Sequence, residues 1–385
     1  MRRRAVAALV AAVAAGLASA APAQAADPGR WVLAQADHVP IEYFQGLTHS
    51  AAGSWFFAGP AEGLYRTDRR LAEHARNPQA IAPAVTLGIG FNHIGDPTWD
   101  RAEGGRLLLP LECYTPGAQN GGNTCGRGAF GVADPATLGW RYLVPLDPAD
   151  IPKAMWAEVS PDGRLVWTSS GQDLLAYRTA DITPQAAAAG IPPRPVARLA
   201  GAVPPSGVTG AAFYRGRLLL AGQAGGPLQM WSVDLTGRTP RRLEAELPGV
   251  AAESEGLDVL AARGGLLHWL LSPFAPGGRP PTYGTGHSEL LTFVPRADAR
   301  LRLSVTPARP VAGRPATLTA RVTLFYAGRR HAVAGAQVQA GGRAARTDAR
   351  GIVRLRVTPR PGAVLRVVAT KQRLLPARAT VRAGA

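Results

Sequence analysis

The chain is poor in lysine and cysteine and lacks the common catalytic motifs. Of its 385 residues two are lysines and two are cysteines, although Lys and Arg together number 43. The patterns G-x-S-x-G, H-E-x-x-H and G-x-x-x-x-G-K-[ST] are absent, which excludes those serine-nucleophile, zinc-helix and phosphate-loop sites. Gly88 and Gly90 lack the third glycine of a dinucleotide fingerprint. After residue 25 no apolar run is long enough to span a bilayer, so we expect no transmembrane segment in the mature chain.

The N-terminus has the three parts of a cleavable secretion signal. Arg2 to Arg4 precede an apolar stretch from Ala5 to Ala20, and the small-x-small sequence Ala23-Gln24-Ala25 follows. We therefore predict a signal peptide over residues 1–25, with cleavage before Ala26. The alternative is a retained anchor, but the stretch has about 16 residues against the ~20 that span a bilayer. The expected location is extracellular, either released or held non-covalently at the cell surface.

Export implies an oxidising environment, in which Cys113 and Cys125 are expected to form a disulfide. The residues between them include Gly117, Gly121 and Gly122 and little that could anchor the segment by burial. A catalytic or metal-binding pair is the alternative. The spacing is not C-x-x-C and no histidine lies between the cysteines, which favours the disulfide.

Positive charge is concentrated at the C-terminal end. The formal net charge is +17, and residues 300–385 contain 17 Arg and one Lys against Asp348 alone. Residues 27–299 are therefore slightly acidic overall. Exported proteins rarely meet nucleic acid, so we expect an anionic cell-wall polymer, an acidic polysaccharide or lipid headgroups as partner. The alternative is a solvated arginine-rich face that reflects coding bias, since all but two of the 43 Lys and Arg residues are arginine.

A repeat of about 50 residues divides residues 26–299. A glycine followed by an apolar run occurs five times, which is typical of the second strand of a hairpin. The five runs begin at Gly53, Gly105, Gly163, Gly216 and Gly265.

Each apolar run is followed by further short candidate strands, so that four of the five repeats have four strands each. Third strands are predicted at 64–68, 130–134, 175–181, 230–234 and 290–294. The fifth repeat lacks a fourth strand, and Trp31 to Ala34 could supply it. Four strands per repeat are typical of the blades of a β-propeller. We predict an all-β fold with five blades, or six if 82–91 forms its own blade; an irregular β-sandwich or β-helix is the competing fold.

Residues 300–385 are predicted to form a separate β domain. Segments such as 301–305, 316–322, 353–357 and 364–368 alternate apolar residues with Arg or Thr, as in half-buried antiparallel sheets. The segment from Val333 to Val338, then Thr347-Asp348 and Gly351, resembles bacterial immunoglobulin-like and carboxypeptidase-regulatory-like modules. That resemblance implies a seven-strand sandwich that acts as a spacer or adhesive domain.

A second resemblance concerns the repeats themselves. Phe91-Asn-His-Ile-Gly-Asp96 and Glu253-Ser-Glu-Gly-Leu257 look like turns of exported bacterial propeller proteins of unsettled activity. The resemblance implies a propeller with a site at the mouth of its channel, where ligands meet the loops. The predicted ligand-binding residues are His49, His93, Asp96 and Glu253.

The innermost strand of each blade lines the channel of a propeller. The segments 46–49, 92–96, 155–158, 207–209 and 253–258 are predicted to be these strands, and three of them carry carboxylates. Asp96, Glu158 and Glu255 could bind Ca²⁺ through oxygen ligands, although no cofactor is required by the sequence. Alternatively, Glu158 and Glu255 with His93 could be the acid and base of a glycosidic or ester hydrolysis. A third interpretation is a hydrated channel with no site.

Two functions remain open at this point. The first is a secreted binding or scaffolding protein of the cell envelope, in which the propeller recognises a ligand and the basic domain contacts anionic surface polymers. The second is a secreted hydrolase that uses the carboxylates at the channel mouth. The sequence identifies neither ligand nor substrate.

Overall fold

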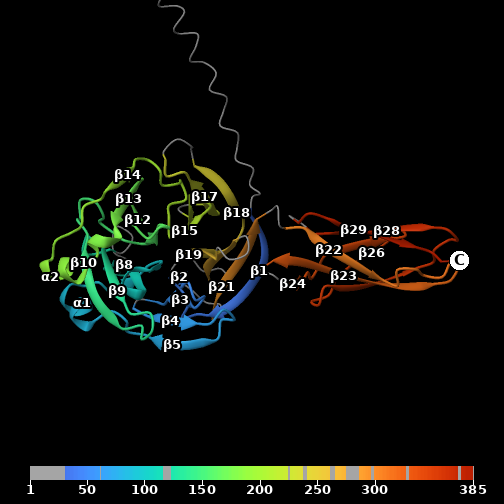
Figure 1. The fold of residues 1–385 in the computed structure, drawn as a ribbon, viewed down its shortest axis with the longest axis horizontal. Helices are drawn as coiled ribbons and strands as arrows, with labels where there is room; N and C mark the ends of the chain where they lie inside the picture. The colour runs from blue at the N-terminus through green and yellow to red at the C-terminus, as the bar shows by residue number, and fades with distance from the viewer. Residues whose placement is uncertain are drawn as a thin grey trace, which may run out of the picture.

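A computed structural model describes residues 31–60, 62–115, 123–223, 226–236, 241–260, 265–274, 286–295, 299–326, 329–371 and 374–384. The chain forms a ring of β-sheets, and an elongated pair of sheets extends from one side of that ring (Figure 1). The predicted signal peptide lies outside the described residues. Within them, no helix combines the length and apolar character needed to cross a membrane.

In the part of the chain that the structure describes, the ring consists of five antiparallel sheets, which we call blades 1 to 5 in the order of their innermost strands. Blade 1 contains β2 (Gly46–His49), β3 (Trp55–Ala58), β4 (Leu64–Thr67) and β5 (Glu73–Asn77). Blade 2 contains β6 (His93–Ile94), β7 (Thr98–Asp100), β8 (Arg106–Glu112), β9 (Ala129–Ala133) and β10 (Trp140–Pro145). Blade 3 contains β11 (Glu158–Val159), β12 (Leu165–Ser170), β13 (Asp173–Arg178) and β14 (Ala197–Leu199). Blade 4 contains β15 (Gly210–Tyr214), β16 (Arg217–Gly222), β17 (Leu228–Val233) and β18 (Arg242–Leu247).

Blade 5 is built from both ends of the ring. It contains β19 (Ala252–Leu260), β20 (Leu266–Pro273), β21 (His287–Pro295) and, as its outermost strand, β1 (Trp31–Pro40). Strand β1 pairs with β21 from Trp31 opposite Pro295 to Pro40 opposite His287. The N-terminal strand thus supplies the strand that the last repeat lacks, as predicted, and it covers the edge that β21 would otherwise expose.

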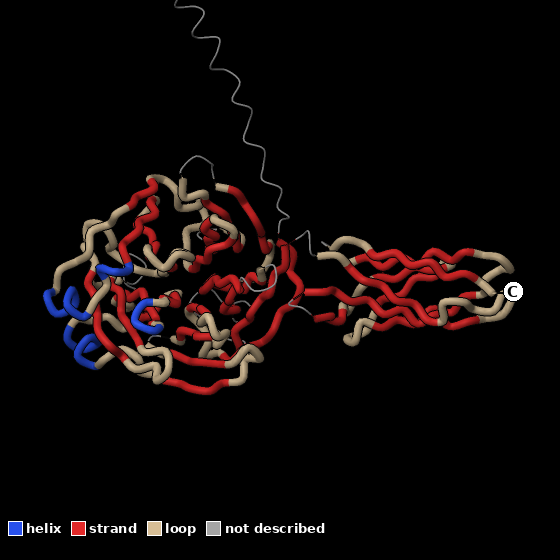
Figure 2. Tube along the Cα trace, viewed as in Figure 1, coloured by secondary structure: helices blue, strands red, loops and turns tan. Residues whose placement is uncertain are grey.

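The five-blade prediction is confirmed and the six-blade alternative is wrong. The segment proposed as an extra blade contains a short helix, α1 (Pro83–Gly88), which Pro83 at its first turn favours. A second helix, α2 (Pro184–Ala189), also starts at a proline, and Thr183 caps it. Both helices lie on the outside of the ring (Figure 2). The predicted inner strand at 207–209 is also displaced, because Gly207 belongs to a turn and β15 begins at Gly210.

The repeated glycines have a common structural reason. All five adopt positive φ, where side chains with a Cβ are strained: Gly53, Gly105, Gly163, Gly216 and Gly265 have φ values of 86°, 111°, 74°, 75° and 89°. Each glycine therefore turns the chain from the first strand of a blade into the second. The repeat visible in the sequence is the repeat of this turn.

Five hydrophobic clusters fill the spaces between adjacent blades. Strand β8 illustrates the packing, because Leu107, Leu109 and Leu111 contact blade 1 residues while Leu108 faces blade 3. Both faces of the middle strands are buried, which explains why their sequences are apolar runs rather than alternating patterns. Trp55, Trp167 and Trp269 belong to these clusters and so contribute to the packing of the blades.

The remaining strands form two four-stranded sheets around one shared core, as in a β-sandwich. Their strands are β22 (Leu301–Thr306), β23 (Ala316–Tyr326), β24 (Arg329–Ala332), β25 (Gln337–Ala340), β26 (Arg343–Arg346), β27 (Ile352–Val357), β28 (Val364–Thr370) and β29 (Ala377–Arg382). This is one strand more than the resemblance implied. The expected domain boundary at residue 300 falls between β21 and β22, and the core of the sandwich continues into blade 5 through Val32, Leu266 and Val294.

Cys113 and Cys125 form the predicted disulfide, with their Cα atoms 5.6 Å apart. Asn123 holds the same segment to the ring, since its Oδ1 accepts a hydrogen bond from the Cys113 N–H and its Nδ2 donates to the Pro152 carbonyl. Residues 116–122, including the three glycines of the predicted flexible segment, lie outside the described residues. The disulfide closes this segment at the end of β8.

Candidate functional site

Asp96 lies at the centre of the ring and contacts all five blades. It follows β6 of blade 2, and its backbone bridges to Trp156 of blade 3. Its carboxylate accepts backbone N–H groups from Leu47 at 2.9 Å and from Ala211 and Leu257 at 3.2 Å, which belong to blades 1, 4 and 5. Burial raises the pKa of Asp96, and the three donated N–H groups oppose that rise. The residue therefore joins the inner strands to one another.

Glycines allow the inner strands to close around Asp96. A Cβ on Gly256 would lie 2.7 Å from the Asp96 carboxylate, and one on Gly46 would meet the Asp96 backbone. Side chains are therefore excluded at these two positions, and the strands approach closely enough to fill the axis. Asp96 lies partway along the central axis of the ring and separates the polar residues of the inner strands into two groups, one on each side of it.

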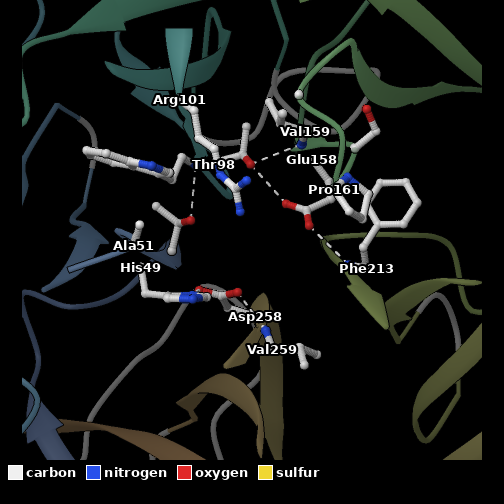
Figure 3. A pocket seen from close by; sticks show the side chains of 14 residues that line it. His49, Ala51, Thr98, Arg101, Glu158, Val159, Pro161, Phe213, Asp258 and Val259 are labelled. Atoms are coloured by element: carbon white, nitrogen blue, oxygen red, sulfur yellow. Dashed lines mark hydrogen bonds and ion pairs between the residues drawn. The ribbon is translucent and has the colours of Figure 1, made fainter. Parts of the chain in front are cut away.

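One group surrounds a pocket where the inner strands end (Figure 3). The pocket has a volume of ≈ 180 Å³, enough for one ring or one acyl group of a larger molecule. It is lined by Thr48, His49, Ala51, Thr98, Trp99, Arg101, Glu158, Val159, Ser160, Pro161, Gly163, Phe213, Asp258 and Val259.

His49 and Asp258 form an ion pair at one wall of the pocket. His49 ends β2 and Asp258 lies on β19, and their Nδ1 and Oδ2 atoms are 2.6 Å apart. Burial alone would lower the pKa of His49, but the charge of Asp258 and its hydrogen bond outweigh burial, so that this pKa is raised above 6.5. The pair occupies Nδ1 and leaves Nε2 as the imidazole nitrogen that can meet a ligand.

Glu158 occupies another wall of the pocket and is buried. Its Oε2 accepts a hydrogen bond from the Thr98 hydroxyl at 2.9 Å, and its Oε1 accepts the Phe213 N–H at 3.0 Å. Burial raises the pKa of Glu158 well above its usual value, and the negative charge of Asp258 raises it further. The surroundings of Glu158 therefore favour its protonated form, whereas the environment of His49 favours the protonated imidazole.

Arg101 adds a positive charge to the pocket. Its side chain points into the pocket beside Thr98 (Figure 3). Among the described residues its guanidinium group makes no hydrogen bond and no ion pair. Apolar side chains, including Trp99, Pro161 and Phe213, complete the wall. A ligand with a negative group would find an unpaired cation there.

The second group lies at the opposite end of the axis. His93 Nε2 is 2.7 Å from Oε1 of Gln45, and Glu112 pairs with Lys153 at 2.9 Å. Burial, with the nearby Lys153 charge, lowers the pKa of His93 to about 4, so this imidazole is neutral at neutral pH. Burial raises the pKa of Glu255 well above its usual value, and its Oε1 has no partner among the described residues.

The predicted site residues thus lie at three different positions along the axis of the ring. Glu158 and His49 lie in the pocket, Asp96 lies between the two ends, and His93, Glu253 and Glu255 precede the Asp96 level on their strands. The proposed acid and base pair of Glu158 and Glu255 is not brought together. Asp258 and Arg101 were missed as site residues. Asp258 lies two residues after Gly256 and so faces the same side of strand β19. A bulge at Glu255 interrupts the regular alternation of sides along this strand, so residues before and after the bulge do not follow the pattern that the sequence suggests.

The three carboxylates proposed for Ca²⁺ are likewise separated. They lie at different positions along the axis, and their oxygen atoms already accept hydrogen bonds from the protein. Asp96 accepts them from backbone N–H groups, and Glu158 accepts them from Thr98 and Phe213. Among the described residues, the group with three ligand atoms within 4.8 Å of one another is His38, His287 and Glu289, on blade 5.

No protein-family model and no curated protein sequence matches the chain. Solved structures do resemble it in architecture. An exo-β-1,3-galactanase from Phanerochaete chrysosporium is 9% identical over 92% of this chain and 99% of its own, with a TM-score of 0.43. A GH43 β-1,3-galactosidase is 10% identical over 88% and 79%, with a TM-score of 0.45. Glutaminyl cyclase from Myxococcus xanthus is 12% identical over 69% and 97%, with a TM-score of 0.43. Resemblances at this level give no argument about activity.

Proposed function

We propose that the protein is an exported hydrolase of a glycosidic or ester bond and that the pocket of Glu158, His49 and Asp258 is its active site. The observation that carries the proposal is that a buried carboxyl group, Glu158, and an imidazole held by Asp258, His49, line the same pocket. An acid and a base in different environments of one pocket are what acid and base catalysis requires, and burial raises the pKa of Glu158 in the direction that suits the acid.

Glu158 would act as the general acid. Both of its protein partners donate hydrogen bonds to it, because the Thr98 hydroxyl accepts the Val159 N–H and donates its own proton, and Phe213 donates an N–H. The proton of the carboxyl group is therefore left for a ligand in the pocket. In the reaction that proton passes to the oxygen of the leaving group as the bond to that oxygen breaks.

His49 would act as the general base. Asp258 holds Nδ1 and orients the ring, so that Nε2 of the neutral imidazole takes a proton from a water molecule that attacks the substrate. The water oxygen forms the new bond while the leaving group departs with the proton from Glu158. The unpaired Arg101 favours a substrate that has a negative group near the bond that breaks.

The test uses untagged mature protein and fluorogenic glycosides, carboxylic esters and phosphoesters. Glu158→Gln and His49→Gln should each lower kcat by roughly 10²- to 10⁴-fold on the substrate that is cleaved. Glu246→Gln is the matched control, because Glu246 lies on the outer strand β18 and pairs with Gln229 away from the pocket. Full activity in Glu158→Gln, or no cleavage of any class, contradicts the proposal.

A binding role for the sandwich is compatible with this activity. Strand β27 alternates buried Val353, Leu355 and Val357 with exposed Arg354 and Arg356, which places these arginines on its solvent face. The density of exposed arginine supports attachment to an anionic polymer, which would bring the pocket to its substrate. The disulfide supports a location outside the cytoplasm, because disulfides persist in oxidising environments.

Attachment is tested with the whole mature chain and purified cell walls. Binding should weaken as salt rises from 50 to about 500 mM, since screening shortens the range of the charges. Arg354→Gln combined with Arg356→Gln should weaken binding while leaving hydrolysis of a small substrate unchanged. Binding that is insensitive to salt would contradict an electrostatic attachment.

A further inference from the structure

Two histidines and one glutamate meet on the strands that close the ring. His38 lies on β1 directly opposite Glu289 on β21, and His287 lies two residues before Glu289 on the same strand. Residues opposite each other, and residues two apart along a strand, share one face of a sheet. The register therefore places all three side chains on one face of blade 5, far along the chain from one another but adjacent in space.

The three side chains are close enough to share one ion. One ligand atom from each lies within 4.8 Å of the other two. The His38 and His287 rings are stacked with their centroids 3.8 Å apart and their planes at 23°, so that they stand side by side on the sheet. His38 is exposed and the other two are half-buried, which leaves a route from solvent.

We propose that His38, His287 and Glu289 bind a divalent transition-metal ion of the zinc class, which links the first strand of the ring to the last. Two imidazoles with one carboxylate are a ligand set that suits Zn²⁺, with a fourth position left for water. Ca²⁺ does not suit it, because calcium takes six to eight oxygen ligands. The site is independent of the pocket and of the reaction assigned to it.

The bound ion stabilises the closed form of the ring. Strand β1 is the outermost strand of blade 5 and comes from the N-terminal end of the described chain, whereas β21 comes from the end of the ring. The three ligands are assembled only when β1 is paired, so an ion that binds them favours the closed ring over the unfolded chain. At a free zinc concentration 100 times the dissociation constant, the equilibrium constant for unfolding should fall about 100-fold.

The experiment uses untagged mature protein that has been stripped with a chelator and dialysed. Titration with ZnCl₂ should show one strong site per chain, and the melting temperature should rise with zinc. His38→Ala and His287→Ala should each lose the strong site and the rise in melting temperature. His74→Ala is the matched control, since His74 is an exposed histidine of blade 1 that pairs with Asp68, and it should keep both.

A second measurement separates a bound ion from an effect on folding. Co²⁺ in place of zinc should give visible ligand-field absorption in the wild type, and Glu289→Gln should alter the spectrum while far-ultraviolet circular dichroism stays unchanged. Zinc binding that persists in both histidine variants overturns the proposal. Zinc binding without a rise in melting temperature overturns the link to ring closure, and displacement of zinc by equimolar Ca²⁺ overturns the class of metal.

Discussion

Nδ1 of His49 lies 2.6 Å from Oδ2 of Asp258, and this pair joins blade 1 to blade 5 beside the pocket. The carboxylate raises the pKa of the imidazole against the effect of burial. On the acidic side of that raised pKa the imidazole is protonated and cannot act as a base. The protonation of His49 should therefore set the lower pH limit of the proposed reaction, and ionisation of Glu158 should set the upper one.

The first prediction concerns Asp258→Asn. The substitution removes the negative charge but leaves the burial of His49, so the pKa of His49 should fall below its wild-type value. Titration of the His49 ring followed by NMR measures this directly, and the acidic limb of kcat/KM should move to lower pH with it. An unchanged His49 titration would show that Asp258 does not control its protonation.

The second prediction concerns Asp96, whose carboxylate accepts three backbone N–H groups from three blades. Asp96→Ala leaves these buried donors without partners, which should lower the free energy of unfolding by about 3 kcal/mol or more. Asp96→Asn keeps an acceptor and should cost less. Urea denaturation measures both, with the exposed Asp162→Ala as control, for which a change of roughly 0.5 kcal/mol is expected. Equal effects of Asp96→Ala and Asp162→Ala would contradict the structural role.

The third prediction concerns the disulfide between Cys113 and Cys125. Replacing both cysteines by serine removes a constraint on the unfolded chain and should lower the free energy of unfolding by about 2 to 3 kcal/mol. A reducing agent should destabilise the wild type to a similar extent and leave the double variant unchanged. Sensitivity of the double variant to the reducing agent would point to a different cause.

The fourth prediction concerns His268, which is buried and whose Nδ1 has no partner among the described residues. Burial lowers the pKa of His268 to about 4. Between about pH 6.5 and 4 the unfolded chain therefore binds a proton that the folded chain does not, and stability falls as the pH falls. Wild type should lose about 2 kcal/mol more than His268→Phe between pH 7 and pH 5.

Urea denaturation of both proteins at the two pH values measures this difference. If wild type and His268→Phe lose equal stability between pH 7 and pH 5, burial does not hold His268 neutral. The comparison between variants is needed because Glu158 and Glu255, whose pKa values are raised, change wild-type stability in the opposite direction over this range.

Much of the fold was predictable because short sequence patterns indicate its turns and strands. A turn that needs positive φ requires glycine, so five such turns leave five glycines at regular intervals. Middle strands buried on both faces leave apolar runs, as at Leu107 to Leu109. The missing fourth strand of the last repeat predicted that the N-terminal strand closes the ring. The first two signals depend on residues close in the chain, and the third depends on the number of strands in each repeat.

The arrangement of the site depended on contacts that no local pattern contains. The sequence by itself determined that polar residues of the inner strands face one axis, because alternation along a strand sets which side each residue faces. Only the tertiary structure decided which of them meet. Asp96 closes the axis and separates Glu158 from Glu255, and the bulge at Glu255 turns Asp258 toward His49. Likewise, His38 and His287 come together only through the register between the first and last strands of the ring.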